Sequence, residues 1–291
     1  MDTRSLRLPI QTPFAADVLL AFLGVRAVPG IEEVRDGTYM RSVWQPGGVG
    51  VVAMTPRSDH IAVRNWSEGS PDLDGLRDRA RRAFDLDADA AAIDTALAAD
   101  PTMAPLVARI PGIRVPGTFD GFELVVRAIF GQQVSVVGAR TSLARLVTAA
   151  GKPLDRPRGE ITHLFPSAER VAELPPEAFG MPRARAQSIR RVADLVTRGD
   201  LDLSGDAPVD DTLGTLAEVP GIGPWTLAYV AMRALRDLDA FMPGDLGVRK
   251  GFEALGLEST QKRMLERAER WRPWRAYAVM HLWHAHPRAH R

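Results

Sequence analysis

The spacing of apolar residues along this chain changes near residue 70, from the alternation of strands to the period of helices. Residues 1–70 contain one helix-like run, "PFAADVLLAFLGVRAVPG", followed by "TYMRSVWQPGGVGVVAMTPRSDHIAVRNW", in which β-forming residues alternate with turn residues. Gln45-Pro46-Gly47-Gly48 predicts a hairpin turn between two of these strands. From about Leu73 the apolar residues follow the helical period. A small β-rich unit followed by a helical body predicts the α+β class.

The helical part is divided by Gly- and Pro-rich stretches, which we interpret as loops: "PGIRVPGTFD", "GKPLDRPRGE" and "GDLDLSGDAP". Between them the period predicts helices over 74–84, 90–99, 120–130, 134–149, 167–173, 183–198, 211–217, 224–235, 246–255, 260–270 and 272–284.

Composition excludes several classes of protein. The chain of 291 residues contains no cysteine, which rules out disulfides, thiolate zinc sites and cysteine-ligated iron–sulfur clusters. We expect a cytoplasmic protein, because the first residues do not resemble a signal peptide and no apolar run approaches about 20 residues. The net charge is +1, yet residues 249–291 hold ten Lys or Arg against four acids. This basic end indicates either a face for polyanions or an Arg-rich surface without a partner.

The segment "DDTLGTLAEVPGIGPWTLAYVAMRAL" predicts a helix, a tight turn and a second helix. Gly221 and Gly223 can adopt φ > 0, and Pro224 suits the first turn of a helix. The backbone N–H groups at such a helix start can bind a phosphate oxygen, and residues 221–223 with Trp225 and Thr226 are the candidates. Such a hairpin can hold a nucleic-acid backbone without reading its sequence. A plain turn between helices is the alternative, because a lone Gly-x-Gly is a weak signal.

One helix later, "LDAFMPGDLGVRKGF" places Asp245 at the start of a predicted helix, where it can act as an N-cap. A hairpin followed by an Asp in a Pro-Gly-Asp loop resembles the helix-hairpin-helix DNA glycosylases, whose loop holds an essential Asp. The blocks "VRAIFGQQVSV", "FPSAERVAEL", "LPPEAFGMPRARAQSI", "VPGIGPWTLAYVAMRAL", "FMPGDLGVRKGF" and "ERWRPWRAYAVMHLW" are similar, in order and spacing, to the bacterial 3-methyladenine-DNA glycosylase II branch. The N-terminal "PFAADVLLAFLGVRAVPGIEEV" and "TYMRSV" resemble its first domain.

The resemblance implies three domains. A TATA-binding-protein-like α+β unit spans 1–90. An all-helical domain spans 119–237 and holds the hairpin at about 211–235. A second all-helical domain combines 91–118 with 238–291, so that the active site lies in the cleft between the helical domains.

The resemblance also implies a reaction, the excision of alkylated purines from duplex DNA after the nucleotide has been flipped out of the helix. Asp245 would stabilise the positive charge that develops on the sugar. Trp225, Tyr229 and Trp283, with Phe22 from the first domain, match the aromatic residues that bind a cationic base. Without the resemblance, aromatic residues at helical spacing predict a core. Leu246 departs from the family, which has an aromatic residue after the catalytic Asp, so the breadth of substrates stays open.

Three further site assignments rest on the same resemblance. Gln132 and Gln133, in the turn of "GQQVS", would wedge into the DNA, and buried glutamines at a helix end are the alternative. Relatives that cut the backbone have a Lys where this chain has Trp225, which implies a monofunctional enzyme. No cofactor is required, although main-chain carbonyls of Ala217, Val219 and Ile222 match those that bind Na or K in the family.

The C-terminal "HLWHAHPRAH" contains four histidines, which we interpret as a solvated tail rather than a metal site. As partner we expect double-stranded DNA with alkylated bases, and for the protein a monomer associated with a bacterial nucleoid. Two alternatives stay open: a glycosylase for deaminated or oxidised purines, and a non-catalytic, structure-specific DNA-binding protein that uses the hairpin as a clamp.

Overall fold

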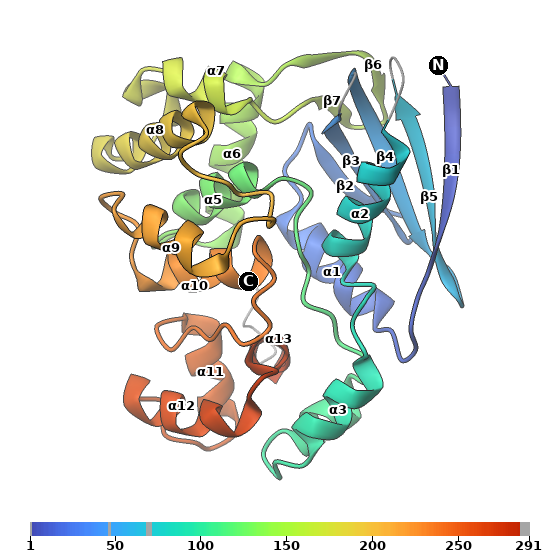
Figure 1. The fold of residues 1–291 in the computed structure, drawn as a ribbon, viewed down its shortest axis with the longest axis vertical. Coiled ribbons are helices and arrows are strands. Elements are labelled where there is room, and N and C mark those ends of the chain that lie inside the picture. The colour runs from blue at the N-terminus through green and yellow to red at the C-terminus, as the bar shows by residue number, and fades with distance from the viewer. Residues whose placement is uncertain (1, 46–47, 68–71, 286–291) are drawn as a thin grey trace.

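A computed structural model describes residues 2–45, 48–67 and 72–285, and shows a sheet beside a helical body (Figure 1). The sheet is antiparallel throughout, with its strands in the order β1-β5-β4-β3-β2. These strands are β1 (Asp2–Pro9), β2 (Glu32–Arg35), β3 (Thr38–Gln45), β4 (Gly48–Pro56) and β5 (His60–Ser67). Gln45 pairs with Gly48, as the predicted hairpin requires, while Pro46 and Gly47 lie outside the described residues.

One face of the sheet is covered by α1 (Ala16–Arg26) and α2 (Leu73–Phe84). Because side chains alternate along a strand, β4 supplies Val52 and Met54 to this face, where they pack with Leu19 and Leu76. Val51 points to the opposite face and packs in a smaller apolar cluster.

The helical body follows the predicted period closely. Its helices are α3 (Ala90–Ala98), α4 (Ala104–Arg109), α5 (Gly121–Phe130), α6 (Val136–Ala150), α7 (Ala168–Glu173), α8 (Arg183–Arg198), α9 (Val209–Ala217), α10 (Pro224–Arg233), α11 (Leu246–Ala254), α12 (Gln261–Ala268) and α13 (Arg275–Ala285). Short 3-10 helices span Pro176–Phe179 and Glu269–Trp271. Figure 1 places α5 to α8 at one end of the body and α11 to α13 at the other, with α9 and α10 between them.

Helix α10 separates two apolar cores. Val230 packs in the core formed with α5, α6 and α8, whereas Ala231 and Met232 pack in the core formed with α11 and α13. Tyr229 contacts both cores. The second helix of the hairpin therefore lies at the junction where a cleft between two helical units was predicted; the three domain boundaries remain predictions.

Two elements differ from the prediction. The stretch interpreted as the loop "GKPLDRPRGE" forms β6 (Pro153–Arg158), which pairs with β7 (Ile161–His163), so the body is not all-helical. Leu154 and Ile161 pack against Val49 and Val51 of the sheet, and this burial outweighs the turn signals of the prolines and glycines. The short α4 was not predicted; it has Pro105 in its first turn, where Pro is tolerated.

The sheet is joined to α5 by a buried group of four charged residues and one tyrosine, which we call the interface cluster: Glu32, Tyr39, Arg41, Glu123 and Arg127. Arg41 donates to Glu123 at 2.6 Å and to Glu32 at 3.3 Å. Arg127 donates to Glu32 at 2.7 Å and also pairs with Glu123. The Tyr39 hydroxyl donates to Glu32 at 2.5 Å. Burial opposes ionisation of Glu32, but Arg127 and Arg41 outweigh it and lower its pKa to about 2.

Among the described residues, no helix is long and apolar enough to cross a membrane.

Candidate active site

Asp245 lies at the N-terminus of α11, and the structure surrounds its carboxylate with N–H donors. Its Oδ1 accepts from the backbone N–H of Val248 at 2.9 Å and from the indole N–H of Trp283 at 2.8 Å. Its Oδ2 accepts from the indole N–H of Trp225 at 2.8 Å. Asp245 is therefore both a helix N-cap and the meeting point of α10, α11 and α13, and these bonds hold its carboxylate in one orientation.

The four predicted aromatic residues form two stacked pairs around this carboxylate. Trp225 and Tyr229, one turn apart on α10, have ring centroids 5.2 Å apart and planes inclined by 17°. Phe22 of α1 and Trp283 of α13 have centroids 5.9 Å apart and planes inclined by 14°. The structure thus brings together residues that lie more than two hundred positions apart in the chain.

Two residues that the sequence analysis did not select also lie here, and we call Arg26 and Arg233 the pocket arginines. The guanidinium carbon of Arg26 lies 3.7 Å from the centroid of Phe22 and 5.9 Å from that of Trp283. The guanidinium carbon of Arg233 lies 5.0 Å from the centroid of Phe22 and 5.5 Å from that of Tyr229. Cations are thus already placed near the faces of the predicted base-binding rings.

The two pocket arginines are held differently. Arg233 donates to the Tyr229 hydroxyl at 2.7 Å and to the carbonyls of Pro116 and Gly117 at 2.7 and 3.0 Å. Arg26 donates to the Phe22 carbonyl at 3.3 Å. Burial opposes ionisation of Tyr229, but Arg233 and Arg26 outweigh it and lower the pKa of this phenol.

A signal for the pocket arginines was present in the sequence. Arg26 follows Phe22 by four residues, and Arg233 follows Tyr229 by four residues. Residues four apart share one face of a helix, so each arginine lies beside an aromatic residue that was itself selected.

The remaining pocket candidate, Leu246, lies in the first turn of α11 and is 53% exposed, whereas Phe22 and Trp283 are buried. Leu246 therefore does not complete the aromatic wall in this conformation.

The two predicted wedge residues have different surroundings. Gln132 donates to the Gly221 carbonyl at 3.0 Å and to the Thr226 hydroxyl at 3.1 Å, so it joins the α5–α6 turn to the hairpin. Gln133 is exposed and has φ of 59°, a conformation uncommon outside glycine. Arg185 of α8 donates to the Gln132 carbonyl at 2.9 Å and to Oε1 of Gln133 at 3.2 Å. Gln133 is thus the member of the pair that faces solvent.

The turn between α9 and α10 has the left-handed backbone expected for Gly221, whereas Gly223 is extended, with φ of −100°. Gly221 has φ of +88°, and a Cβ there would lie 2.8 Å from the Ser188 hydroxyl oxygen. Gly223 precedes α10 without a side-chain cap, so the first-turn N–H groups of Trp225 and Thr226 remain available to an anion. The Thr226 side chain itself is buried.

The three carbonyls proposed for a monovalent cation lie at this turn. Ile222, itself buried, donates its N–H to the Val219 carbonyl at 3.1 Å. A carbonyl oxygen has two lone pairs, so Val219 could still contact a cation. Ala217 ends α9, where helix carbonyls lack partners within the helix. The three residues thus lie at the same turn, and a bound monovalent cation stays a prediction.

His281 and His284 belong to α13, in agreement with the helix predicted over 272–284. The interpretation of "HLWHAHPRAH" as solvated is wrong for His281, which is buried. Burial lowers the pKa of His281 to about 3, so this side chain is neutral. His286 and His290 lie outside the described residues. Within the described ranges, no three His, Cys, Asp or Glu side chains gather as they would around a metal ion.

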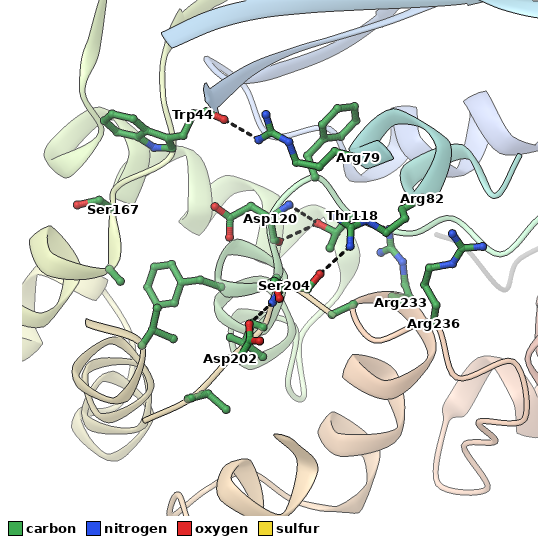
Figure 2. Close-up of a pocket in the computed structure, with 18 of the residues that line it drawn as sticks. Trp44, Arg79, Arg82, Thr118, Asp120, Ser167, Asp202, Ser204, Arg233 and Arg236 are labelled. Atoms are coloured by element: carbon green, nitrogen blue, oxygen red, sulfur yellow. Dashed lines mark hydrogen bonds between the residues drawn. The ribbon is translucent and has the colours of Figure 1, made fainter. Parts of the chain in front are cut away.

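A pocket of about 680 Å³ lies elsewhere, between α2, the start of α5 and the end of α10. Figure 2 shows Arg79, Arg82 and Arg236 on one side of it and Trp44 and Ser167 on the other. None of the predicted site residues lines this pocket. Arg233 lines it and also reaches the aromatic pairs, so it lies between the two.

Two known protein families match this chain. Residues 5–120 match the AlkA N-terminal domain, and residues 126–276 match the HhH-GPD superfamily base excision DNA repair protein. The chain is 35% identical over 279 residues to DNA-3-methyladenine glycosylase 2 of Escherichia coli, covering 94% of this chain and 95% of that one.

A second relative is longer than this chain. The probable bifunctional transcriptional activator/DNA repair enzyme AlkA of Mycobacterium tuberculosis is 43% identical over 281 residues, which is 97% of this chain and 57% of that protein. The chain thus spans little more than half of this relative.

The fold is also found in a solved structure. A 3-methyladenine DNA-glycosylase from Archaeoglobus fulgidus superposes with a TM-score of 0.80 at 21% identity, covering 97% of both chains. The sequence matches, extending over both the sheet unit and the helical body, show that the chain belongs to the HhH-GPD superfamily of base excision DNA repair proteins, in its AlkA branch.

Proposed function

We propose that the protein is a monofunctional DNA glycosylase that flips alkylated purines, among them 3-methyladenine and 7-methylguanine, out of duplex DNA and hydrolyses their N-glycosidic bond. The observation that carries this proposal is the carboxylate of Asp245, oriented by two indole N–H groups and placed between two stacked aromatic pairs. The relative from Escherichia coli is named a DNA-3-methyladenine glycosylase, which supports the glycosylase part of this proposal.

The residues suit the chemistry of that bond. As the C1′–N bond breaks, its electron pair leaves with the base and positive charge develops on the sugar, where a fixed carboxylate stabilises it. Water then adds to C1′ and gives up a proton, and Asp245 is placed to orient that water. A purine alkylated at N3 or N7 is already cationic, so it departs without prior protonation.

The other parts of the proposal concern DNA. The first-turn N–H groups of α10 would bind a phosphate, with a Na or K ion contributing at the carbonyls of Ala217, Val219 and Ile222. Gln133 would occupy the gap left by the flipped nucleotide. Trp225 stands where a lyase would need an amine nucleophile, so the product is an uncut abasic site. The protein would act as a monomer at the bacterial nucleoid and initiate base excision repair.

The decisive experiment compares wild type with Asp245→Asn on methylated duplex DNA under single-turnover conditions. Asn keeps the N-cap, so the fold should persist, while loss of the charge should slow base release by about 10²–10³-fold. Asp89→Asn is the matched control, because Asp89 caps α3 through the same kind of bond to Ala92. Strand scission should appear only after alkali.

Two outcomes would contradict the proposal. Full turnover by Asp245→Asn would remove the catalytic role of this carboxylate. Tight binding of lesion-containing DNA by wild type, with no base released, would instead favour the non-catalytic clamp.

A further inference from the structure

The aromatic pairs around Asp245 already have a cation of their own. Arg26 is the last residue of α1, and its guanidinium lies 3.7 Å from the Phe22 centroid and within cation–π distance of Trp283. A permanently cationic base that used the same ring faces would therefore meet a guanidinium there.

Arg26 remains charged in these surroundings. Burial lowers its pKa to about 10, and the neighbouring Arg233 acts in the same direction, while Asp245 and Tyr229 partly offset them. Its guanidinium is thus protonated at neutral pH and only partly balanced by nearby charge. Two like charges at short range in a half-buried site repel each other more strongly than they would in water.

The two pocket arginines have different partners. Arg233, on α10, donates three hydrogen bonds to the Tyr229 hydroxyl and to the carbonyls of Pro116 and Gly117, whereas Arg26, on α1, donates to the Phe22 carbonyl at 3.3 Å and also interacts with Tyr229. A guanidinium has five N–H donors, so Arg26 has further donors for the carbonyl oxygen of a bound base.

We propose that Arg26 is a specificity-determining residue that weakens recognition of permanently cationic bases and favours neutral damaged purines presenting a carbonyl oxygen, the class formed by deamination or oxidation. This inference rests on the proposed function, since it concerns the same pocket. The side chain of Arg26 would then set the relative rates at which cationic and neutral lesions are excised.

The first test compares single-turnover excision of 7-methylguanine and hypoxanthine from otherwise identical duplexes by wild type, Arg26→Met and Arg26→Lys. In Arg26→Met, which removes the charge, the rate of 7-methylguanine excision relative to that of hypoxanthine should rise about tenfold. This change is of the size expected when a cationic base gains one cation–π contact. Lys, which keeps the charge, should return the ratio toward wild type. Arg158→Met is the control, because Arg158 lies 4.4 Å from the centroid of Trp66, in the distant sheet unit.

A second test does not depend on activity. 1-Methylnicotinamide and nicotinamide share one planar ring and differ in a permanent positive charge. NMR titration gives the dissociation constant of each probe. Relative to wild type, Arg26→Met should bind the cationic 1-methylnicotinamide about tenfold more tightly, when compared with the neutral nicotinamide. Arg158→Met should leave this preference unchanged.

The outcomes separate the two proposals. An unchanged rate ratio and an unchanged probe preference in Arg26→Met would overturn the role of Arg26, and so would an equal fall of both excision rates. If wild type releases neither base, the proposed function fails, and the probe preference still decides whether Arg26 disfavours cations.

Discussion

The interface cluster and the aromatic site both bury arginines, but they balance the charge differently. In the interface cluster, Arg41 and Arg127 each bond the carboxylates of Glu32 and Glu123. In the site, Arg233 bonds neutral oxygens and Arg26 lies on an aromatic ring. Charges matched by opposite charges hold two parts of a fold in place, whereas charges left partly unmatched remain able to act on a bound molecule.

We expect the greatest loss of stability from a substitution within the interface cluster. Glu123→Ala removes the carboxylate that accepts a 2.6 Å hydrogen bond from the buried guanidinium of Arg41. Because this leaves a buried charge without its nearest partner, the free energy of unfolding should fall by about 3–5 kcal/mol. Urea unfolding followed by circular dichroism measures this. The control is Glu266→Ala, which removes an exposed pair with Arg263 and should change the free energy of unfolding far less, because water screens exposed charges. Equal losses in both variants would show that the interface cluster is no more important than a surface pair.

The second prediction concerns pH. The pKa of Glu32 is lowered to about 2 in the folded protein, below its unfolded value, so the unfolded state binds the proton more readily as pH falls. The stability from Glu32 is therefore complete above about pH 5 and is lost progressively toward pH 2. Acid unfolding followed by fluorescence should show this loss in wild type, and Glu32→Gln should have a flatter dependence. Equal slopes would assign the acid sensitivity to other carboxylates.

The third prediction concerns the aromatic site, where we expect the smallest change. Trp283→Phe keeps a ring to stack on Phe22 but removes the N–H that bonds Asp245. Loss of one hydrogen bond to a charged group should lower the base-release rate about tenfold and change the free energy of unfolding by about 1–2 kcal/mol. Single-turnover kinetics and urea unfolding measure the two quantities. A large loss of stability with an unchanged rate would make this site structural, like the interface cluster.

Local sequence patterns were sufficient to predict the division of the chain and most of its helices. The change of period near residue 70 predicted the sheet unit and the helical body, because apolar periodicity reflects which face of each element is buried. The helix over 183–198 was predicted with its observed bounds, and the turn around Gly221 with its left-handed backbone. Resemblance then selected Asp245 and the four aromatic residues, which the structure brings together.

Contacts between residues far apart in the chain could not be predicted from local patterns. The β6–β7 pair forms because the sheet buries Leu154 and Ile161, a partner that its own turn-rich sequence does not reveal. Arg41 and Glu123 are 82 residues apart, and nothing local to either indicates the other. Arg26 lies one helical turn from Phe22, yet its position against Trp283 and Asp245 depends on packing α1 beside α13. Short-range spacing fixes the face of a helix, whereas contacts between elements depend on how the whole core packs.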